Sequence, residues 1–129
     1  ARAQQHPFVR YGLAEGLPQI MVRALAQDSA GFLWVGTRGG LARFDGYAFT
    51  IFGKDEGLPN ASIRALLPAP GGGVWAATPN GLALVQGGRV QAFGEADGLP
   101  NAFVSALAPG PGGKLYAATS RGIALYEAG

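Results

Sequence analysis

Three copies of one segment constrain the fold of this chain more than any other feature of its sequence. The segment reads GFLWVGTRGGLARF at residues 31–44, GGVWAATPNGLALV at residues 72–85 and GKLYAATSRGIALY at residues 113–126. The copies align without a gap and start at residues 31, 72 and 113, which gives a period of 41 residues. A tandem repeat of about 20–50 residues is typical of solenoids, propellers and similar arrays. The repeat therefore limits the possible folds before any single residue is considered.

The composition limits the classes of partner and of chemistry. The 129 residues are 48% hydrophobic and include 22 Gly and 9 Pro, which is enough for one core with many turns. Only 14% of the residues are charged, the formal net charge is +2 and the basic residues are scattered, so we expect no nucleic-acid partner. The absence of Cys excludes disulfides and thiolate metal sites. No apolar run reaches the roughly 20 residues of a membrane helix, and no membrane contact by this segment is expected.

Each repeat is predicted to hold four short antiparallel strands. It opens with a turn module, EGLPQ, EGLPN or DGLPN, in which Gly permits a positive φ and Pro fixes φ. Gly-rich breaks and hairpin signals then separate short apolar runs. The predicted first strands are residues 21–26, 62–67 and 103–108, and the second strands are residues 32–37, 74–78 and 115–119. The third strands are residues 41–44, 82–85 and 123–126, and the fourth strands are residues 48–52 and 89–93.

This pattern predicts an all-β fold of the β-propeller type, with three four-stranded blades. Four strands in about 40 residues, with a recurring aromatic residue and glycine turns, are typical of a propeller blade. Trp34, Trp75 and Tyr116 occupy the same repeat position and are predicted to form structural core between blades. The predicted domains are a polar tail at residues 1–6 and three blades at residues 7–129, with repeats at residues 15–55, 56–96 and 97–129.

Residues 8–11 are predicted to be an outer strand that completes the last blade. Tyr11 aligns with Phe52 and Phe93 at the ends of the fourth strands, whereas the third repeat has no fourth strand of its own. Propellers contain roughly four to eight blades, so three blades do not close a ring. We expect a homo-oligomer in which two chains share a six-bladed ring, or alternatively further blades of a longer chain.

The repeats resemble the two-component regulator propeller family. The most similar stretches are DEGLPNASI at residues 55–63 and GFLWVGTRGGLARFDG at residues 31–46, and the resemblance covers residues 8–127. In later repeats Asp28 is replaced by Ala69 and Gly110, so a role specific to Asp28 is not expected. The resemblance implies a periplasmic or extracytoplasmic sensor region of a bacterial two-component or diguanylate cyclase signalling protein.

The sequence favours a protein that is not an enzyme. The only histidine, His6, lies in the predicted tail, and a propeller similar to streptogramin lyase would need a central histidine. Glu15, Glu56 and Asp97 recur at one repeat position, which indicates a turn or cap role. Acidic residues are too sparse for a Ca²⁺ site, so neither a metal nor a cofactor is expected. A lyase-type enzyme remains a lesser alternative.

Candidate ligand-binding residues are predicted at one end of the blades. Alternating strand directions place the turn modules and the turns after the second strands at the same face of the ring. Their polar side chains suit an oligosaccharide or a peptide. The candidates are Arg38, Asn80 and Arg121 in the turns, Gln19, Asn60 and Asn101 in the modules, and Arg23 and Arg64 at the first strands. We therefore predict a non-catalytic ligand-sensing segment, with a structural or oligomerisation module as the alternative.

Overall fold

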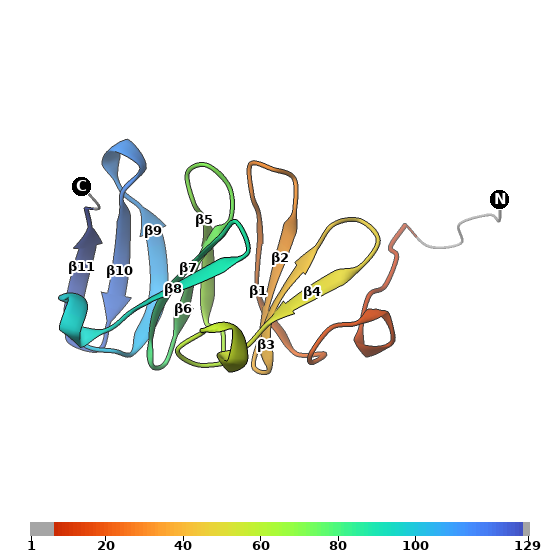
Figure 1. The fold of residues 1–129 in the computed structure, drawn as a ribbon, viewed down its shortest axis with the longest axis horizontal. Coiled ribbons are helices and arrows are strands. Elements are labelled where there is room, and N and C mark those ends of the chain that lie inside the picture. Colours follow the sequence, from red (N-terminus) through yellow and green to blue (C-terminus); the bar gives the residue numbers. More distant parts are fainter. Residues whose placement is uncertain (1–6, 128–129) are drawn as a thin grey trace.

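Three antiparallel sheets lie side by side in a row (Figure 1). The computed structural model describes residues 7–127; the predicted tail at residues 1–6, with His6, lies outside the described residues. We call the sheets the first, second and third blade. The first blade has the strand order β1-β2-β3-β4, the second β5-β6-β7-β8 and the third β11-β10-β9. None of the helices within residues 7–127 has the length and apolar character needed to cross a membrane.

Tight turns and Gly-rich loops bound every strand. The first blade consists of β1 (Val22–Gln27), β2 (Leu33–Thr37), β3 (Gly40–Phe44) and β4 (Phe49–Phe52). The second consists of β5 (Ala65–Pro68), β6 (Val74–Thr78), β7 (Gly81–Gln86) and β8 (Arg89–Phe93), and the third of β9 (Val104–Pro109), β10 (Leu115–Thr119) and β11 (Gly122–Tyr126). Short 3-10 helices occur at η1 (Leu13–Glu15), η2 (Lys54–Glu56), η3 (Glu95–Asp97) and η4 (Pro111–Gly113).

Within residues 7–127 the first two blades have the predicted four antiparallel strands, and the third blade has three. Residues 8–11, predicted to be an outer strand in a ring shared between chains or in a longer propeller, have no strand structure in the single chain, so this prediction is not confirmed. A strand needs a neighbour with which to pair its backbone groups. The free edge of the third blade, β11, lies at the opposite end of the row from the N-terminal segment (Figure 1).

The predicted start of the first strand in the second blade is also corrected by the structure. Residues 62–64 belong to the connector, and β5 begins at Ala65. The Ile63 N–H donates a hydrogen bond of 2.8 Å to the Thr37 carbonyl oxygen, which belongs to the first blade. The backbone at Ile63 is therefore paired between blades before β5 enters its own sheet.

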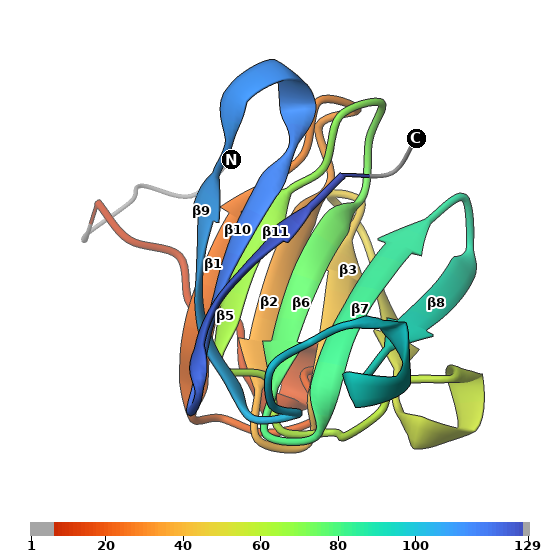
Figure 2. The same cartoon turned by 90° about the vertical axis from the view of Figure 1, so that its left-hand side faces the viewer.

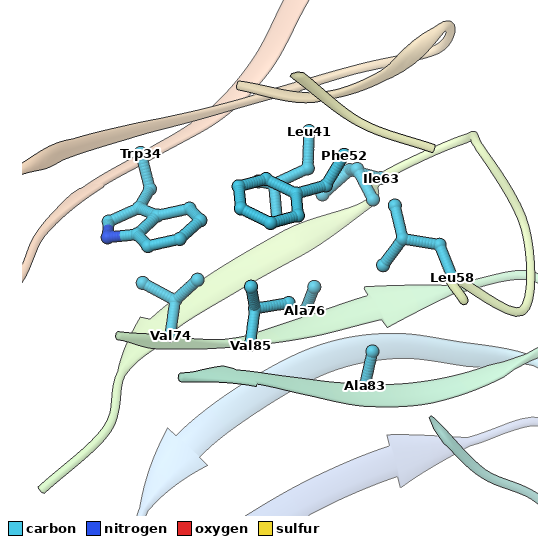
Figure 3. Close-up of a cluster of buried hydrophobic side chains, with 9 residues drawn as sticks. All are labelled: Trp34, Leu41, Phe52, Leu58, Ile63, Val74, Ala76, Ala83 and Val85. Carbon is cyan, nitrogen blue, oxygen red and sulfur yellow. The ribbon is translucent and has the colours of Figure 1, made fainter. Parts of the chain in front are cut away.

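The interface between the first and second blades is filled by large apolar side chains. Trp34, Leu41 and Phe52 extend from the first blade toward Val74 and Val85 of the second (Figure 3). The rings of Trp34 and Phe52 are 5.6 Å apart. Complete burial of a side chain of this kind contributes about 1.5–3 kcal/mol, so this layer is a main source of stability. The cluster also contains Leu58, Ile63, Ala76 and Ala83.

The second interface repeats this arrangement one blade further along. Trp75 is 3% exposed, and its ring centroid lies 5.8 Å from that of Phe93 and 4.6 Å from that of Tyr126, which belongs to the third blade. Val104 and Leu115 of the third blade are buried in the same cluster. The middle blade is consequently covered on both faces.

Tyr116 differs from the two tryptophans whose repeat position it shares. It was predicted to be structural core between blades, but it is 39% exposed. The reason is its place in the row, because the face of the third blade that carries Tyr116 has no further sheet against it in this chain (Figure 2). The repeat position has the same orientation in each blade, and only the presence of a neighbour decides whether it is buried.

Candidate functional site

The turns after the second strands and the connectors before the first strands lie along one edge of the row, the lower edge in Figure 2. We call this edge the turn face. In the first blade the turn lies on its connector, since a Cβ built on Gly39 would be 3.5 Å from the Pro18 carbonyl oxygen. In the second, the Asn80 side-chain nitrogen is 3.5 Å from the Pro59 carbonyl oxygen. The turn face comprises the turns at residues 38–39, 79–80 and 120–121, the connectors at residues 16–21, 57–64 and 98–103, and Arg23 near the start of β1.

A threonine fixes the backbone of each turn. The Thr37 hydroxyl donates to the Gly40 carbonyl oxygen at 2.9 Å and accepts the Gly39 N–H at 3.0 Å. The same two hydrogen bonds occur at Thr78, with lengths of 2.7 and 3.1 Å, and at Thr119, with lengths of 2.7 and 3.1 Å. Each turn thus has a uniform backbone with a variable tip. The predicted site residues Arg38, Asn80 and Arg121 are all exposed at these tips.

Two of the predicted connector residues, Asn60 and Asn101, stabilise the backbone of their own turns. The side-chain oxygen of Asn60 accepts the Ser62 N–H at 2.9 Å, and that of Asn101 accepts the Phe103 N–H at 2.9 Å. Both are local side-chain turns of the kind that Asn commonly forms. Their oxygens are therefore engaged, while the amide nitrogens are left to donate. Gln19, the equivalent residue of the first repeat, is half-buried.

The two arginines predicted at the first strands lie in different surroundings. Arg23 is exposed, whereas Arg64 is half-buried with its guanidinium carbon 4.8 Å from the centre of the Phe103 ring. The distance is that of a cation–π contact. The Arg64 Nε is buried and has no hydrogen-bond partner within residues 7–127. Arg64 therefore keeps hydrogen-bond donors that the protein does not use.

The four arginines of the turn face form no recorded ion pair within residues 7–127. They are Arg23, Arg38, Arg64 and Arg121, and the recorded ion pair of this part of the chain joins Lys114 and Glu127 at 3.3 Å. The recurring carboxylates form hydrogen bonds with backbone groups and not with these arginines. Glu15, Glu56 and Asp97 each accept a hydrogen bond from the backbone N–H of the glycine three residues before them, at Gly12, Gly53 and Gly94. This confirms the cap role that their recurrence predicts.

Two charged residues have structural roles that the sequence did not predict, and for Asp28 the structure corrects the expectation that it has no specific role. Asp28 is buried, and its two carboxylate oxygens accept hydrogen bonds from the Trp34 indole at 2.8 Å and from the Gly73 N–H at 3.1 Å, as well as from the N–H groups of Ala30 and Phe32 at 3.0 Å. Burial raises the pKa of Asp28, but the four hydrogen bonds together lower it by more. The pKa therefore lies below its ordinary value of 3.8. Gly73 belongs to the second blade, so Asp28 joins two blades. Asp28 has a structural role, and it lies at the edge of the blades opposite to the turn face.

Arg43 is the second unidentified charge, in the middle of β3. Its guanidinium carbon is 4.8 Å from the centre of the Phe32 ring and 5.9 Å from those of Trp34 and Phe52. The sequence signal was a charge inside an apolar strand whose copies, Leu84 and Leu125, are leucines. Arg43 covers the aromatic layer of the first interface and does not extend the turn face.

Within residues 7–127 no group of three or more His, Asp or Glu side chains is placed to hold a metal ion. The turn face instead presents guanidinium and amide groups, which donate hydrogen bonds and carry charge. Such groups can bind carboxylates, phosphates and hydroxyl-rich molecules. The geometry is that of a binding surface built on fixed turns.

A family model described as "Two component regulator propeller" matches residues 16–39. Residues 16–39 are thus similar to the two component regulator propeller repeat. The matched residues run from the turn module of the first repeat through β1 and β2 to the turn at Gly39. They include the connector at residues 16–21 and the turn at residues 38–39, and they end before β3. The family resemblance predicted from the sequence is confirmed.

Two solved structures of extracellular domains are similar to this repeat chain. One belongs to a protein described as a hybrid two component system, BT3049 of B. thetaiotaomicron, with 28% identity, a TM-score of 0.81 and coverage of 92% of this chain and 17% of that one. The other belongs to BT4673 of the same organism, described as a one component system, with 16% identity, a TM-score of 0.47 and coverage of 83% and 24%. Comparison with curated protein sequences finds no match. This chain spans less than a fifth of the BT3049 domain.

Proposed function

We propose that this chain is a non-catalytic segment of an extracytoplasmic sensor propeller and that it binds its ligand at the turn face. The observation that carries the proposal is the set of four arginines at this face that form no ion pair within residues 7–127. Unpaired guanidinium groups on a fixed backbone are available to a ligand. The two component regulator propeller repeat and the similarity to the extracellular domain of BT3049 support the sensor role and the location. We also propose that the sensor passes its signal to a two-component or diguanylate cyclase output module.

The chemistry of the turn face favours an acceptor-rich ligand. The oxygens of Asn60 and Asn101 are engaged within their turns, so the side chains offered to a ligand are mainly donors. A carboxylate that meets a guanidinium forms charge-assisted and often bidentate hydrogen bonds. We therefore propose an oligosaccharide or a peptide that carries carboxylate groups, with neutral oligosaccharides as the weaker class.

Calorimetric titration with acidic and neutral oligosaccharides and with acidic peptides tests this proposal. Replacing Arg38→Ala or Arg121→Ala removes one exposed guanidinium from the turn face, and we expect affinity for an acidic ligand to fall about tenfold or more, because a hydrogen bond to a charged group contributes about 1.5–3 kcal/mol. The matched control is Arg89→Ala, an exposed arginine that begins β8 at the other end of the blade. Equal losses in the control, or no binding of any ligand class by the wild-type chain, contradict the proposal.

A second candidate function is assembly of a propeller from several chains, with six blades from two chains favoured. The observation that favours it is the open state of both ends of the row, since β11 has a strand neighbour on one side only and Tyr116 is partly exposed. Further blades of a longer chain are the alternative occupants of these ends. Light scattering tests the assembly, and a monomer at all concentrations contradicts it without affecting the ligand-binding proposal.

A further inference from the structure

The two blade interfaces differ at the position of Asp28. At the first interface the Asp28 carboxylate lies between the blades and accepts the Trp34 indole N–H at 2.8 Å and the Gly73 N–H at 3.1 Å. Its repeat equivalent at the second interface is Ala69, whose side chain has no acceptor atom. The second interface therefore lacks the group that accepts these hydrogen bonds at the first.

Trp75 has the same arrangement in its blade as Trp34 has in the first. Its ring centroid lies 5.8 Å from that of Phe93 at an interplanar angle of 42°, against 5.6 Å and 34° for Trp34 with Phe52. Trp75 is 3% exposed, and no hydrogen bond of its indole N–H is recorded within residues 7–127. A buried indole N–H usually has a partner. The indole of Trp75 thus keeps an unused donor.

A pocket of about 180 Å³ lies beside Ala69 at the second interface. Trp75 of the second blade and Tyr126 of the third also line it. A further lining residue, Leu84, replaces Arg43, which covers the aromatic layer of the first interface. The pocket thus results from two substitutions between repeats. It is larger than the roughly 10–15 Å³ that one water needs, so it has room for a small organic group.

The loop that forms one wall of the pocket is held in place by hydrogen bonds. The Ala69 N–H donates to the Gly73 carbonyl oxygen at 3.0 Å, and the Gly72 N–H donates to the Ala69 carbonyl oxygen at 3.2 Å. The Gln86 side chain, which also lines the pocket, donates to the carbonyl oxygens of Pro70 and Gly72 at 2.9 and 2.8 Å. A site that is fixed before binding loses little entropy when a ligand enters.

The donors at this pocket favour a carboxylate. Besides the Trp75 indole, the Gly71 N–H has no recorded acceptor within residues 7–127, and Gly71 is the repeat equivalent of Ala30. At the first interface the equivalent indole and the Ala30 N–H both bind the Asp28 carboxylate. Burial raises the pKa of Asp28, but its hydrogen bonds lower it by more, so donors in this arrangement favour an ionised carboxylate.

The charges around the pocket are compatible with an anion. Gly113 and Tyr126, which line it, are the chain neighbours of Lys114 and Glu127. Lys114 and Glu127 form an ion pair at 3.3 Å, so the charge of Glu127 is compensated. None of the lining residues carries a negative charge. A carboxylate in the pocket therefore meets hydrogen-bond donors and no opposing carboxylate among the residues that line it.

We propose that the pocket at the second interface binds a small carboxylate, which takes the place that the Asp28 side chain fills at the first interface. The carboxylate accepts the Trp75 indole N–H, with the Gly71 N–H as a second donor, and its organic part lies against Leu84 and Tyr126. Formate and acetate are the smallest ligands of this class. The pocket lies at the edge opposite to the turn face, so the inference goes beyond the ligand site proposed above.

Titration with sodium acetate tests this site, with the indole N–H signals in proton–nitrogen correlation spectra as the readout. The chain has two tryptophans, and Trp75→Phe assigns the two signals by removing one of them. We expect the Trp75 signal to move saturably at millimolar acetate, because one or two charge-assisted hydrogen bonds support only weak binding. The Trp34 signal should stay in place. Sodium chloride at the same concentration controls for ionic strength.

A Trp75 signal that acetate does not move, or two indole signals that move equally, overturns the proposal. The first result would mean that the pocket holds water only, and the second would mean that acetate acts without a specific site. The indole signals report on the blade interfaces, so either result leaves the turn-face proposal unaffected.

Two variants exchange the properties of the two interfaces. Ala69→Asp supplies the carboxylate from the chain itself, and the response of the Trp75 signal to acetate should fall about tenfold or more. Asp28→Ala opens the equivalent place at the first interface, so the Trp34 signal should then respond to acetate as well. An unchanged response in Ala69→Asp, or no response of Trp34 in a folded Asp28→Ala variant, overturns the proposal. If Asp28→Ala does not fold, the comparison of Ala69→Asp with the wild type decides.

Discussion

At the scale of single residues, Asp28 shows how one side chain can join two repeat units. Its carboxylate accepts the N–H groups of its own loop, the indole of Trp34 and the N–H of Gly73 in the next blade. A buried carboxylate is stable only when its oxygens are paired, and here they are. Ala69 and Gly110 at the equivalent positions cannot do this, so the first interface has a polar link that the second lacks.

Replacing Asp28→Ala should lower the free energy of unfolding by about 2–4 kcal/mol, because it leaves buried N–H donors without an acceptor. Asp28→Asn should cost less, since its amide keeps one acceptor oxygen. The measurement is urea unfolding at neutral pH. Asp45→Asn serves as a control, because Asp45 also accepts two backbone N–H groups but at an exposed hairpin, and its loss should be smaller. A loss at Asp45 equal to that at Asp28 would contradict the interpretation.

The lowered pKa of Asp28 also predicts how the free energy of unfolding depends on pH. The folded pKa of Asp28 is lowered from 3.8, so its ionised form is favoured by folding. Its contribution is fully present above the unfolded pKa and is lost as the pH falls through the folded value. The stability difference between the wild type and Asp28→Asn should therefore be constant at neutral pH and decrease below pH 3.8. A difference that grows on acidification would show that another group controls it.

Gly36 is a second residue whose identity is set by its neighbour in the next blade. Gly36→Ala should destabilise the chain by about 1–3 kcal/mol, because its Cβ would lie 2.5 Å from the Ile63 Cγ2. Ile63→Val alone should cost about 0.5–1.5 kcal/mol through lost burial. Together they reproduce the pair at the next interface, Ala77 and Val104, which are both fully buried. The double variant should therefore be more stable than the sum of the two losses predicts. A double-mutant cycle by urea unfolding measures this coupling, and additive losses would contradict it.

At the scale of elements, the repeated unit is the hairpin of the second and third strands with its threonine. One hydroxyl donates a hydrogen bond to a carbonyl oxygen and accepts one from a backbone N–H, and this pair sets the same turn in all three blades, whatever residues occupy the tip. The hairpin thus separates its two tasks. Thr and Gly maintain the backbone, and Arg38, Asn80 and Arg121 are free to differ.

Thr78→Val should lower the free energy of unfolding by about 1–3 kcal/mol, since the residue is fully buried and both hydrogen bonds would be lost without replacement by water. Thr119→Val removes the same two hydrogen bonds in the third blade, where Thr119 is only half-buried. It should cost clearly less. Thermal unfolding of both variants checks the comparison, and equal losses would mean that burial does not decide the contribution.

At the scale of the whole molecule, the row of blades has a stable middle and two open ends. Every residue of β6 is buried, whereas in β10 Leu115 and Ala117 are buried, Tyr116 is exposed, and Ala118 and Thr119 are half-buried. Because stability in repeat arrays is roughly a sum of unit and interface terms, a blade with two covered faces should be the last to open.

Amide hydrogen exchange should therefore be at least tenfold slower in β6 than at the equivalent positions of β10, measured at concentrations where the chain is monomeric. If chains assemble, the open face of the third blade becomes covered. The protection of β10 against exchange should then rise with protein concentration. Equal protection of β6 and β10 in the monomer would contradict the interpretation that coverage on both faces stabilises the middle blade.

Much of the element structure could be predicted from the sequence, because it depends on local signals. The second strand of the middle repeat was predicted at residues 74–78 and is found as Val74–Thr78, since glycine turns bound it on both sides. The start of β5 was predicted three residues too early, because a hydrogen bond from Ile63 to another blade holds the connector. Of the candidate site, the grouping of turns and connectors at one end could be predicted from strand alternation, but the use of the Asn60 oxygen within its own turn reduces what that residue can offer a ligand.

The sequence by itself determined the repeat, its period and the strand and turn within each copy, because these follow from spacing, turn chemistry and apolar patterning. Only the tertiary structure decided which copies are buried. Trp34, Trp75 and Tyr116 are the same position of the repeat, yet the first two are core and the third is partly exposed. The difference arises because a face is buried only where two sheets lie against each other, and within residues 7–127 the third sheet has a neighbour on one face only.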